Sequence, residues 1–296
     1  MFAMARSAHG VFRDLSRMIG AGLLAMAAAL STICGVAAAQ DRFIVVASTT
    51  STDNSGLFEH LLPIFTGRTG IEVRIIAVGT GQALGMARRG DADVLLVHDA
   101  PSELALMREG FGAQRREVMY NDFVVFGPTG DAAGIRGLAE AADALRRIAE
   151  MRAPFVSRGD DSGTHKAEVR LWLAAGIDAG AASGTWYRET GAGMGATLNI
   201  AQAMGAYGLA DRATWTSFAN RDGLEVLVEG DPGLFNQYSV ILVNPKKFPH
   251  VKAVGGRAFM DWLSSPEGQR AIADFRVDGR QLFFPNAQGS KAKAGG

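Results

Sequence analysis

The sequence predicts an α/β fold with two lobes, each a mainly parallel sheet flanked by helices. Short apolar runs alternate with stretches of helical periodicity, which is typical of parallel strands covered by helices. After about residue 126 the next apolar runs are farther apart. Two apolar strands, 123–126 and 238–243, are each closely followed by a proline and bracket the intervening region. We therefore expect the chain to leave a first lobe near Phe126 and to return near Val240 through two hinge strands.

These boundaries assign residues 40–126 and 240–296 to the first lobe and residues 127–239 to the second. The alternative is a single continuous sheet with a long insertion. The length of 296 residues permits one large domain or two modest ones.

The first lobe begins with three strand–helix pairs. Gly90 is placed to end the second helix, and Pro101 to begin the third. Pro63 should kink or shorten the first helix, because proline has no amide hydrogen to donate. The expected order is 43–47 (strand), 57–65 (helix), 71–78 (strand), 82–89 (helix), 94–97 (strand) and 101–109 (helix).

The region from the first hinge strand to the second is expected to begin and end with these two strands. Its elements follow from apolar runs and from helical spacing of apolar residues. The expected order is 123–126 (strand), 138–151 (helix), 154–157 (strand), 185–190 (weak strand), 196–206 (helix) and 238–243 (strand).

The N-terminal segment has the pattern of a cleavable signal peptide over residues 1–39. Three arginines precede an apolar stretch that ends in an A-x-A pattern at Ala39, so we expect export to the periplasm. A retained membrane anchor is the alternative. The only cysteine, Cys34, lies in this segment, so the mature chain offers no disulfide or thiol chemistry.

Composition excludes several classes of function. The chain is 48% hydrophobic and 20% charged, as in ordinary globular proteins. A formal net charge of +0 argues against a nucleic-acid-binding surface. Cleavage would remove three of the 30 basic and one of the 30 acidic residues, leaving 27 against 29 and a charge of −2. The histidines His60, His98, His165 and His250 lack metal-ligand spacing, so we expect surface or capping roles and no metal site.

Three polar loops follow predicted strands and precede predicted helices: residues 48–55, 79–81 and 157–164. Ligands of open parallel sheets bind beyond the carboxyl ends of the strands. Helix N-termini, hydroxyls and glycines together make donor-rich sites for small anions. Each loop alone could be an ordinary helix cap. Because three occur at strand ends, we expect them to surround a small tetrahedral anion.

Two of these loops resemble the ligand loops of the tungstate-binding proteins of ABC importers. They read STTSTDNSGL from residue 48 and SRGDDSGTH from residue 157. Ser48 stands where the family motif has its first Thr, but a hydroxyl is kept. Further similar stretches are GTGQAL, GDADVLLVHDAPSE, YNDFVVFGP, GMGATLNIA and YSVILVNP. The resemblance therefore covers nearly all of the chain after the N-terminal segment.

The resemblance implies a periplasmic-binding-protein fold whose two lobes close on an oxyanion. It implies a receptor, a monomer without cofactor, that delivers its ligand to an ABC permease and its ATPase. Arg158 is permanently charged and can donate to two oxygens at once, so we expect it to matter most. Carried onto this sequence, the ligand-binding residues are Thr49, Thr50, Ser51 and Thr80 from the first lobe and Arg158, Ser162, Gly163 and Thr164 from the second.

Which oxyanion the site prefers depends on whether that oxyanion carries a proton at pH 7. Tungstate, molybdate and sulfate are unprotonated dianions at pH 7 and need only donors, whereas phosphate keeps a proton and gains from an acceptor. Asp160 and Asp161 are candidate acceptors, but we expect them to face away, capping a helix or holding Arg158. Tungstate is preferred to molybdate on the resemblance alone, and molybdate or phosphate remain alternatives.

Two other classes of function remain open. Ser162 and His165 could belong to a secreted hydrolase, but Asp160 replaces the first glycine of the G-x-S-x-G motif and no third member is identifiable. A sensor that reports ligand occupancy to a signalling partner is the other. Residues 191–196 fit a dinucleotide-binding pattern only loosely, and we expect them to begin a helix, with backbone N–H groups available to a ligand.

Overall fold

The computed structural model describes residues 43–287, which lie within one compact unit, Asp41–Gly296. The predicted signal peptide lies outside these described residues. Within residues 43–287, every helix is too short or too polar to cross a bilayer.

Strands and helices alternate as predicted up to α5, and their order is less regular after it. The helices are α2 (Thr50–Asn54), α3 (Leu57–Thr69), α4 (Thr80–Arg89), α5 (Ala100–Arg108), α6 (Ala141–Glu150), α7 (Gly163–Ala174), α8 (Met194–Met204), α9 (Arg212–Ser217), α10 (Ala253–Ser264), α11 (Pro266–Asp274) and the 3₁₀ helices η1 (Ala179–Ala182) and η2 (Pro232–Leu234). The strands are β1 (Phe43–Thr49), β2 (Glu72–Val78), β3 (Val94–Val97), β4 (Gly112–Pro128), β5 (Phe155–Ser157), β6 (Tyr187–Glu189), β7 (Gly208–Asp211), β8 (Leu224–Val228), β9 (Phe235–Val243), β10 (Arg276–Val277), β11 (Arg280–Gln281) and β12 (Phe284–Pro285).

The main sheet has the order β12-β4-β9-β3-β1-β2. Strands β1, β2 and β3 are parallel, so their carboxyl ends share one edge of the sheet. Strand β9 enters antiparallel to β3, and β4 is antiparallel to β9. The sheet is therefore mixed, and only its first three strands form the parallel arrangement that the sequence predicts.

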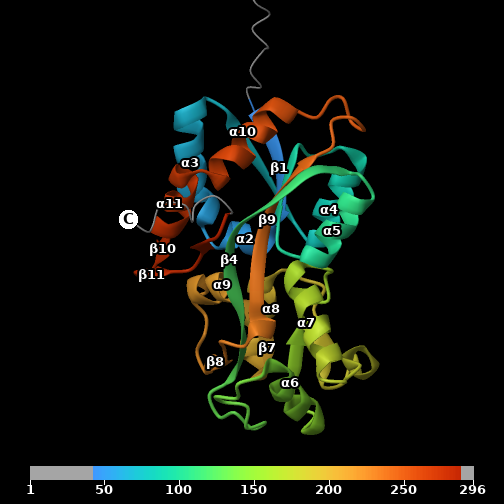
Figure 1. Cartoon of the computed structure of the whole chain (residues 1–296). Helices are drawn as coiled ribbons and strands as arrows, with labels where there is room; N and C mark the ends of the chain where they lie inside the picture. Colours follow the sequence, from blue (N-terminus) through green and yellow to red (C-terminus); the bar gives the residue numbers. More distant parts are fainter. Residues whose placement is uncertain (1–42, 288–296) are drawn as a thin grey trace, which may run out of the picture. The chain divides into compact units, whose positions relative to one another are not determined.

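The pleat of these strands distributes their side chains to two cores. Val94 and Leu96 of β3 face the core formed with α3, α10 and α11, whereas Leu95 and Val97 face the core formed with α4 and α5. Figure 1 shows these two groups of helices on opposite sides of β9. We call this part of the molecule the first lobe.

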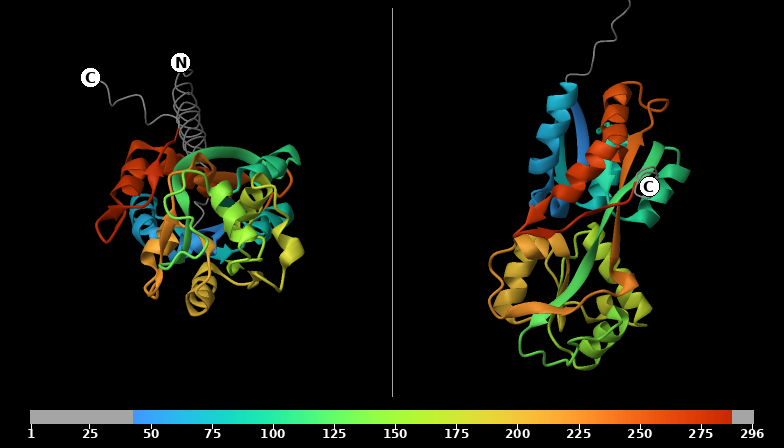
Figure 2. Two further views of the ribbon diagram at one scale, coloured as in Figure 1. Left: turned by 90° about the horizontal axis from the view of Figure 1, so that it is seen from below. Right: turned by 60° about the vertical axis from the view of Figure 1, so that its left-hand side comes forward.

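Two strands continue from the first lobe into a second set of elements. Residues Gly112–Asp122 of β4 pair with β9, and residues Phe123–Pro128 of the same strand pair with β7 and β8. Figure 2 shows β4 and β9 running together through the described unit. The partners of β4 thus change between Asp122 and Phe123, a few residues before Phe126. The lobe boundaries at residues 126/127 and 239/240 stay predictions.

The second lobe is built on the far half of β4. Phe123 and Val125 face a core shared with α6 and α7, and Val124 and Phe126 face one shared with α8 and α9. A separate two-stranded sheet pairs β5 with β6 in parallel, so their carboxyl ends also lie together. Each of these two ends leads through a loop into a helix, α7 after β5 and α8 after β6.

Two local expectations need correction. The polar loop after β1 is not a loop throughout, because Thr50–Asn54 form the short helix α2. Helix α3 is not shortened by Pro63 and continues to Thr69. Because Pro63 has no N–H, the Glu59 carbonyl has no helical hydrogen-bond partner. Both residues are exposed, so water can donate to this carbonyl instead.

Candidate functional site

The end of β1 and the first turn of α2 place three hydroxyls at the edge of the first-lobe sheet. Thr49 caps α2, and its Oγ1 accepts from the Thr52 N–H at 3.3 Å. Thr49 Oγ1 also lies 2.8 Å from Thr52 Oγ1 and 3.1 Å from Ser51 Oγ. The hydroxyl of Thr50 instead accepts from the second lobe, from Arg158 Nη2 at 3.3 Å. Thr49 and Ser51 are buried, so the loop presents its hydroxyls inward.

Thr80 begins α4 at the same edge. Gly79 precedes it as the cap, and a glycine provides no side chain to occupy the helix N-terminus. Thr80 is fully buried, yet its Oγ1 has no hydrogen-bond partner within residues 43–287. A buried hydroxyl without a partner is costly and is characteristic of a site that binds a polar ligand.

The loop after β5 supplies the second lobe's contribution. Ser162 caps α7, with its Oγ accepting from the His165 N–H at 3.2 Å. Gly163 and Thr164 form the first turn of the helix, and both are buried. Thr164 Oγ1, like Thr80 Oγ1, has no partner in the described part of the chain.

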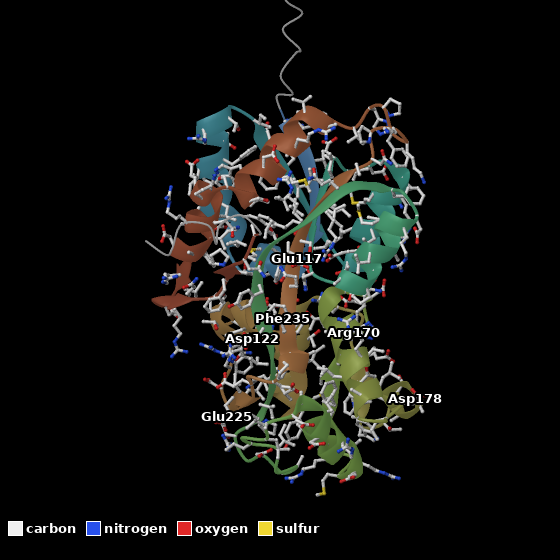
Figure 3. All side chains as sticks on the ribbon, in the orientation of Figure 1. Glu117, Asp122, Arg170, Asp178, Glu225 and Phe235 are labelled. Atoms are coloured by element: carbon white, nitrogen blue, oxygen red, sulfur yellow. The ribbon has the colours of Figure 1, made fainter. Side chains whose placement is uncertain are left out.

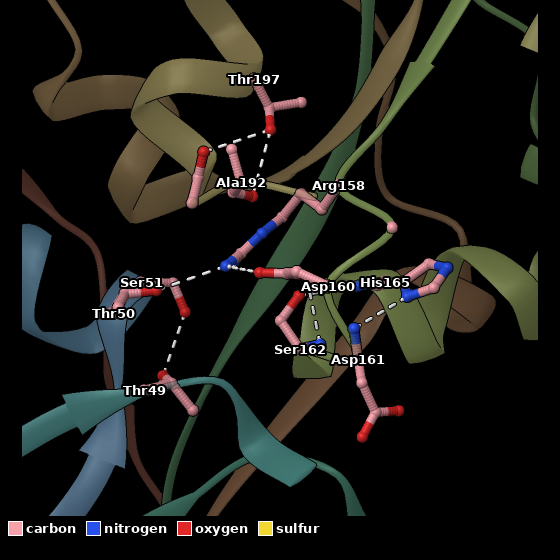
Figure 4. Close-up of polar contacts among 12 residues, drawn as sticks. Thr49, Thr50, Ser51, Arg158, Asp160, Asp161, Ser162, His165, Ala192 and Thr197 are labelled. Carbon is pink, nitrogen blue, oxygen red and sulfur yellow. Dashed lines mark hydrogen bonds and ion pairs between the residues drawn. The ribbon is translucent and has the colours of Figure 1, made fainter. Parts of the chain in front are cut away.

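Arg158 lies between these groups, and only 2% of it is exposed. Its Nη2 forms an ion pair with Asp160 Oδ2 at 2.5 Å and also donates to Thr50. Its Nε and Nη1 are buried without a hydrogen-bond partner in residues 43–287. Figure 4 shows the guanidinium lying between Thr50 on one side and Ala192 and Thr197 on the other. A buried guanidinium with two unpaired nitrogens can donate hydrogen bonds to a small anion.

The loops of the two lobes are in direct contact. The Gly81 N–H donates to the Asp161 carbonyl at 3.3 Å, and Thr214 Oγ1 donates to the Ser51 carbonyl at 3.4 Å. A Cβ added to Gly163 would lie 3.1 Å from Thr80 Oγ1 and 2.7 Å from His98 Cε1. The structure thus brings all eight predicted residues to one region where the lobes meet.

The carboxylates near the site already have hydrogen-bond or ion-pair partners within the protein. Asp160 Oδ1 accepts from the Ser162 N–H at 3.2 Å while its other oxygen holds Arg158, as we expected of this residue. Asp161 pairs with Lys166 and is mainly exposed. Burial raises the pKa of Asp211, whose two oxygens accept from the Thr214 N–H and hydroxyl.

His98 is the site residue that sequence reasoning missed, and the expectation of a surface or capping role for it is wrong. It is 3% exposed and lies at the end of β3, beside the hydroxyls of Thr49 and Ser51. Burial is the main cause that lowers its pKa to about 4, so the ring is neutral at pH 7. The available signal was its position, because His98 directly follows the third predicted strand, at the edge where ligands bind.

The loop after β6 also reaches the site. Thr190 Oγ1 donates to the Arg158 carbonyl at 3.2 Å and lies 3.0 Å from Thr197 Oγ1. The next residues lead into α8, whose cap Gly193 has no side chain to cover the helix N-terminus. Residues 191–193 therefore precede a helix, as expected.

Ser162 and His165 do not form the nucleophile–base pair that a hydrolase needs. Their hydrogen bond runs from the His165 main chain to the Ser162 hydroxyl. The His165 ring instead accepts from the Asp161 N–H through Nδ1 at 3.1 Å. Within residues 43–287, no group of three or more His, Cys, Asp or Glu residues could hold a metal ion.

The fold and the site define an α/β binding protein with a donor-rich site between two lobes. A family model described as a PBP superfamily domain matches residues 35–267. A putative ABC transporter anion-binding protein from Haloferax volcanii is 48% identical over 82% of this chain and 72% of its own length. The tungstate-binding protein TupA of Peptoclostridium acidaminophilum is 46% identical over 82% of this chain and 86% of its own.

A solved structure agrees with these sequence relatives. The tungstate-binding protein TupA from Desulfovibrio alaskensis G20 has 47% identity and a TM-score of 0.71, over 83% of this chain and 99% of that one. The predicted fold class is confirmed. The chain belongs to the PBP superfamily and, within it, to the family of the TupA proteins.

Proposed function

We propose that this protein is the exported receptor of an ABC importer and that its ligand is tungstate, bound at the lobe interface. The observation that carries the proposal is the buried guanidinium of Arg158, with Nε and Nη1 unpaired. The partnerless hydroxyls of Thr80 and Thr164 add donors from both lobes. Charged hydrogen bonds contribute about 1.5–3 kcal/mol each, so a shell of several supports tight binding.

The state of the nearby carboxylates favours an unprotonated dianion over phosphate. A protonated oxyanion needs an acceptor, but Asp160 is held by Arg158 and Ser162, and Asp161 by Lys166. Tungstate and molybdate have nearly the same size and charge, so the donors alone do not separate them. The preference for tungstate follows from the names of two relatives with 46% and 47% identity.

The same relatives support the wider biological setting. One relative is described as an ABC transporter anion-binding protein, and a structure with 45% identity belongs to a tungstate ABC transporter. We propose that the signal peptide is cleaved near Ala39, that the mature protein works as a periplasmic monomer, and that it delivers its ligand to a permease driven by an ATPase. We also propose that closure occurs about β4 and β9, between lobes near the predicted boundaries.

A competition series by calorimetry tests the ligand. Purified protein, freed of bound anion by unfolding and refolding, is titrated with tungstate, molybdate, sulfate and phosphate. We expect tungstate and molybdate to bind, tungstate the more tightly, and sulfate and phosphate to compete poorly. Phosphate binding more tightly than tungstate would contradict the proposal, as would binding of none of the four anions.

A further inference from the structure

A cavity lies against β4 and β9, the two strands that cross between the lobes. Its volume is 410 Å³, which falls in the range of sites for small ligands. Gln281 and Phe284 line it from the first lobe, and Arg212 and residues 230–232 line it from the second. The width of the cavity therefore depends on how the two lobes are arranged.

The alternation of side chains along the strands places this cavity and the proposed anion site on opposite faces. Asn121 of β4 pairs with Asn236 of β9, and the two amides lead to His98 through contacts of 2.7 and 2.9 Å. The next pair in the register is Asp122 and Phe235, whose side chains must point the other way. Both of these residues line the cavity, and Figure 3 marks them on the crossing strands.

Three aromatic rings form the apolar part of the cavity wall. Tyr120 lies between Phe235 and Phe284, with ring centroids 5.1 and 5.2 Å from its own. Phe235 is 52% exposed and Phe284 is 37% exposed. The face of an aromatic ring carries partial negative charge and attracts a cation. These rings thus offer contact area to an apolar group that bears a positive charge.

The polar part of the wall carries more negative than positive charge. Arg212 donates to the two oxygens of Asp122 at 2.7 and 2.6 Å and pairs with Glu229 at 2.7 Å. Asp231 is a further carboxylate of the wall, and its oxygens accept from main-chain N–H groups. Three carboxylates against one guanidinium leave a formal charge of −2. This excess disfavours an anion and favours a cation.

We propose that the cavity binds a small organic cation with an apolar body and that its occupancy strengthens tungstate binding. The second part rests on the proposed function. Because β4 and β9 lie between the two sites, a rotation about them that parts the lobes at the anion site brings the lobes together at the cavity. A cation held in the cavity therefore opposes opening, and tungstate in turn strengthens binding of the cation.

Calorimetry with benzyltrimethylammonium chloride tests both parts, and benzyl alcohol is the neutral control. We expect the cation to bind with a Kd on the order of 1 mM or below, and benzyl alcohol to bind at least about tenfold more weakly. At a saturating concentration of the cation and constant ionic strength, the tungstate Kd should fall at least about threefold. Equal binding of the cation and the alcohol would overturn the cation site. An unchanged tungstate Kd would overturn the coupling.

Two variants test whether the cation binds in this cavity. Phe235→Ala removes the more exposed ring, and Asp231→Asn removes a charge while keeping an oxygen acceptor; each should weaken cation binding about fivefold or more. Asp178→Asn is the matched control, because Asp178 also directly precedes a 3₁₀ helix and lies away from the cavity (Figure 3). Equal cation binding by all three variants would overturn the inference. If the protein bound no tungstate at all, the proposed function would fail, whereas the cation titrations would still test the cavity.

Discussion

At the scale of single residues, Arg158 combines near-complete burial with incomplete pairing. Asp160 neutralises the guanidinium through Nη2 and leaves Nε and Nη1 without partners in residues 43–287. Asp160 is also tied to the Ser162 N–H, so it cannot easily turn toward another group. The pair therefore keeps the cation in place in the absence of ligand and leaves part of its donor fork for an anion.

Removing the Arg158 guanidinium should weaken tungstate binding more than removing any one hydroxyl. We expect Arg158→Ala to raise the Kd at least about 100-fold, since it deletes charged donors worth roughly 1.5–3 kcal/mol each. Thr80→Val and Thr164→Val, which each remove one neutral donor, should raise it about tenfold or less. Calorimetry on the three variants, with circular dichroism to confirm folding, makes the comparison. Unchanged affinity in Arg158→Ala would remove this residue from the site.

The unfolding free energy of the protein should depend on pH through Glu168. It is buried on α7, and its Oε1 accepts from Tyr187 Oη at 2.7 Å and from Trp172 Nε1 at 3.2 Å. Burial is the main cause that raises its pKa to about 7. Its ordinary value is 4.5, so the folded protein binds this proton more tightly than the unfolded chain does.

The stabilisation from Glu168 protonation should therefore be complete below about pH 4.5 and be lost as the pH rises toward 7. The difference in unfolding free energy between the unmodified protein and Glu168→Gln should shift by up to about 3 kcal/mol across this window, in favour of the variant at high pH. Urea unfolding at a series of pH values measures it. A difference that does not vary with pH would show that Glu168 has an ordinary pKa in the folded state.

At the scale of elements, the glycine at the start of α7 sets how closely the lobes approach. Gly163→Ala places a methyl group 2.7 Å from His98 Cε1, a contact across the lobe interface that one side must yield to. Overpacking of this kind costs about 1–3 kcal/mol, so we expect the tungstate Kd to rise about 10- to 100-fold. The measurement is calorimetry, with thermal unfolding to detect damage to the lobe itself.

Gly67→Ala is the control. Gly67 lies in α3, away from the proposed site, and an added Cβ would have no atom within 4 Å. Alanine should leave binding unchanged and stabilise the helix slightly. Equal losses of affinity in both glycine variants would contradict the steric explanation.

The strand–helix pairs of the first lobe could be predicted because their signal is local. Apolar runs mark β1 and β3, and the polar loops after β1, β2 and β5 do meet at one site. The start of β4 could not be predicted, because residues 112–122 are mainly polar and form a strand through their pairing with β9. His98 was missed since nothing within its own segment shows the long-range contact with Asn236.

At the scale of the whole described unit, strand direction also depended on distant pairing. Nothing in the apolar run of β9 indicates that it enters between β3 and β4, antiparallel to both. Once it does so, β4 and β9 become the two strands shared by the lobes. The polar network of His98, Asn236 and Asn121 lies on these strands near the point where β4 changes partners.

The lobes also share an ion pair that lies outside the proposed site. Arg170 Nη1 on α7 donates to Asp99 Oδ1, next to α5, at 2.6 Å. The Asp99 side chain is 1% exposed and that of Arg170 is 47% exposed. Figure 3 marks Arg170 on α7, on the side of the molecule where α5 lies. A buried carboxylate that loses its cation is destabilised, so this pair should favour the closed arrangement of the lobes.

Arg170→Gln should therefore weaken tungstate binding without altering any proposed ligand contact. We expect the Kd to rise about two- to fivefold, mainly through faster dissociation, because the open form no longer has to break the pair. Arg146→Gln is the control: its side chain is 44% exposed, similar to Arg170, but its ion pair with Asp143 lies within α6. Stopped-flow displacement of tungstate by excess molybdate gives the dissociation rates. Equal rates for the two variants would show that the interlobe pair does not control release.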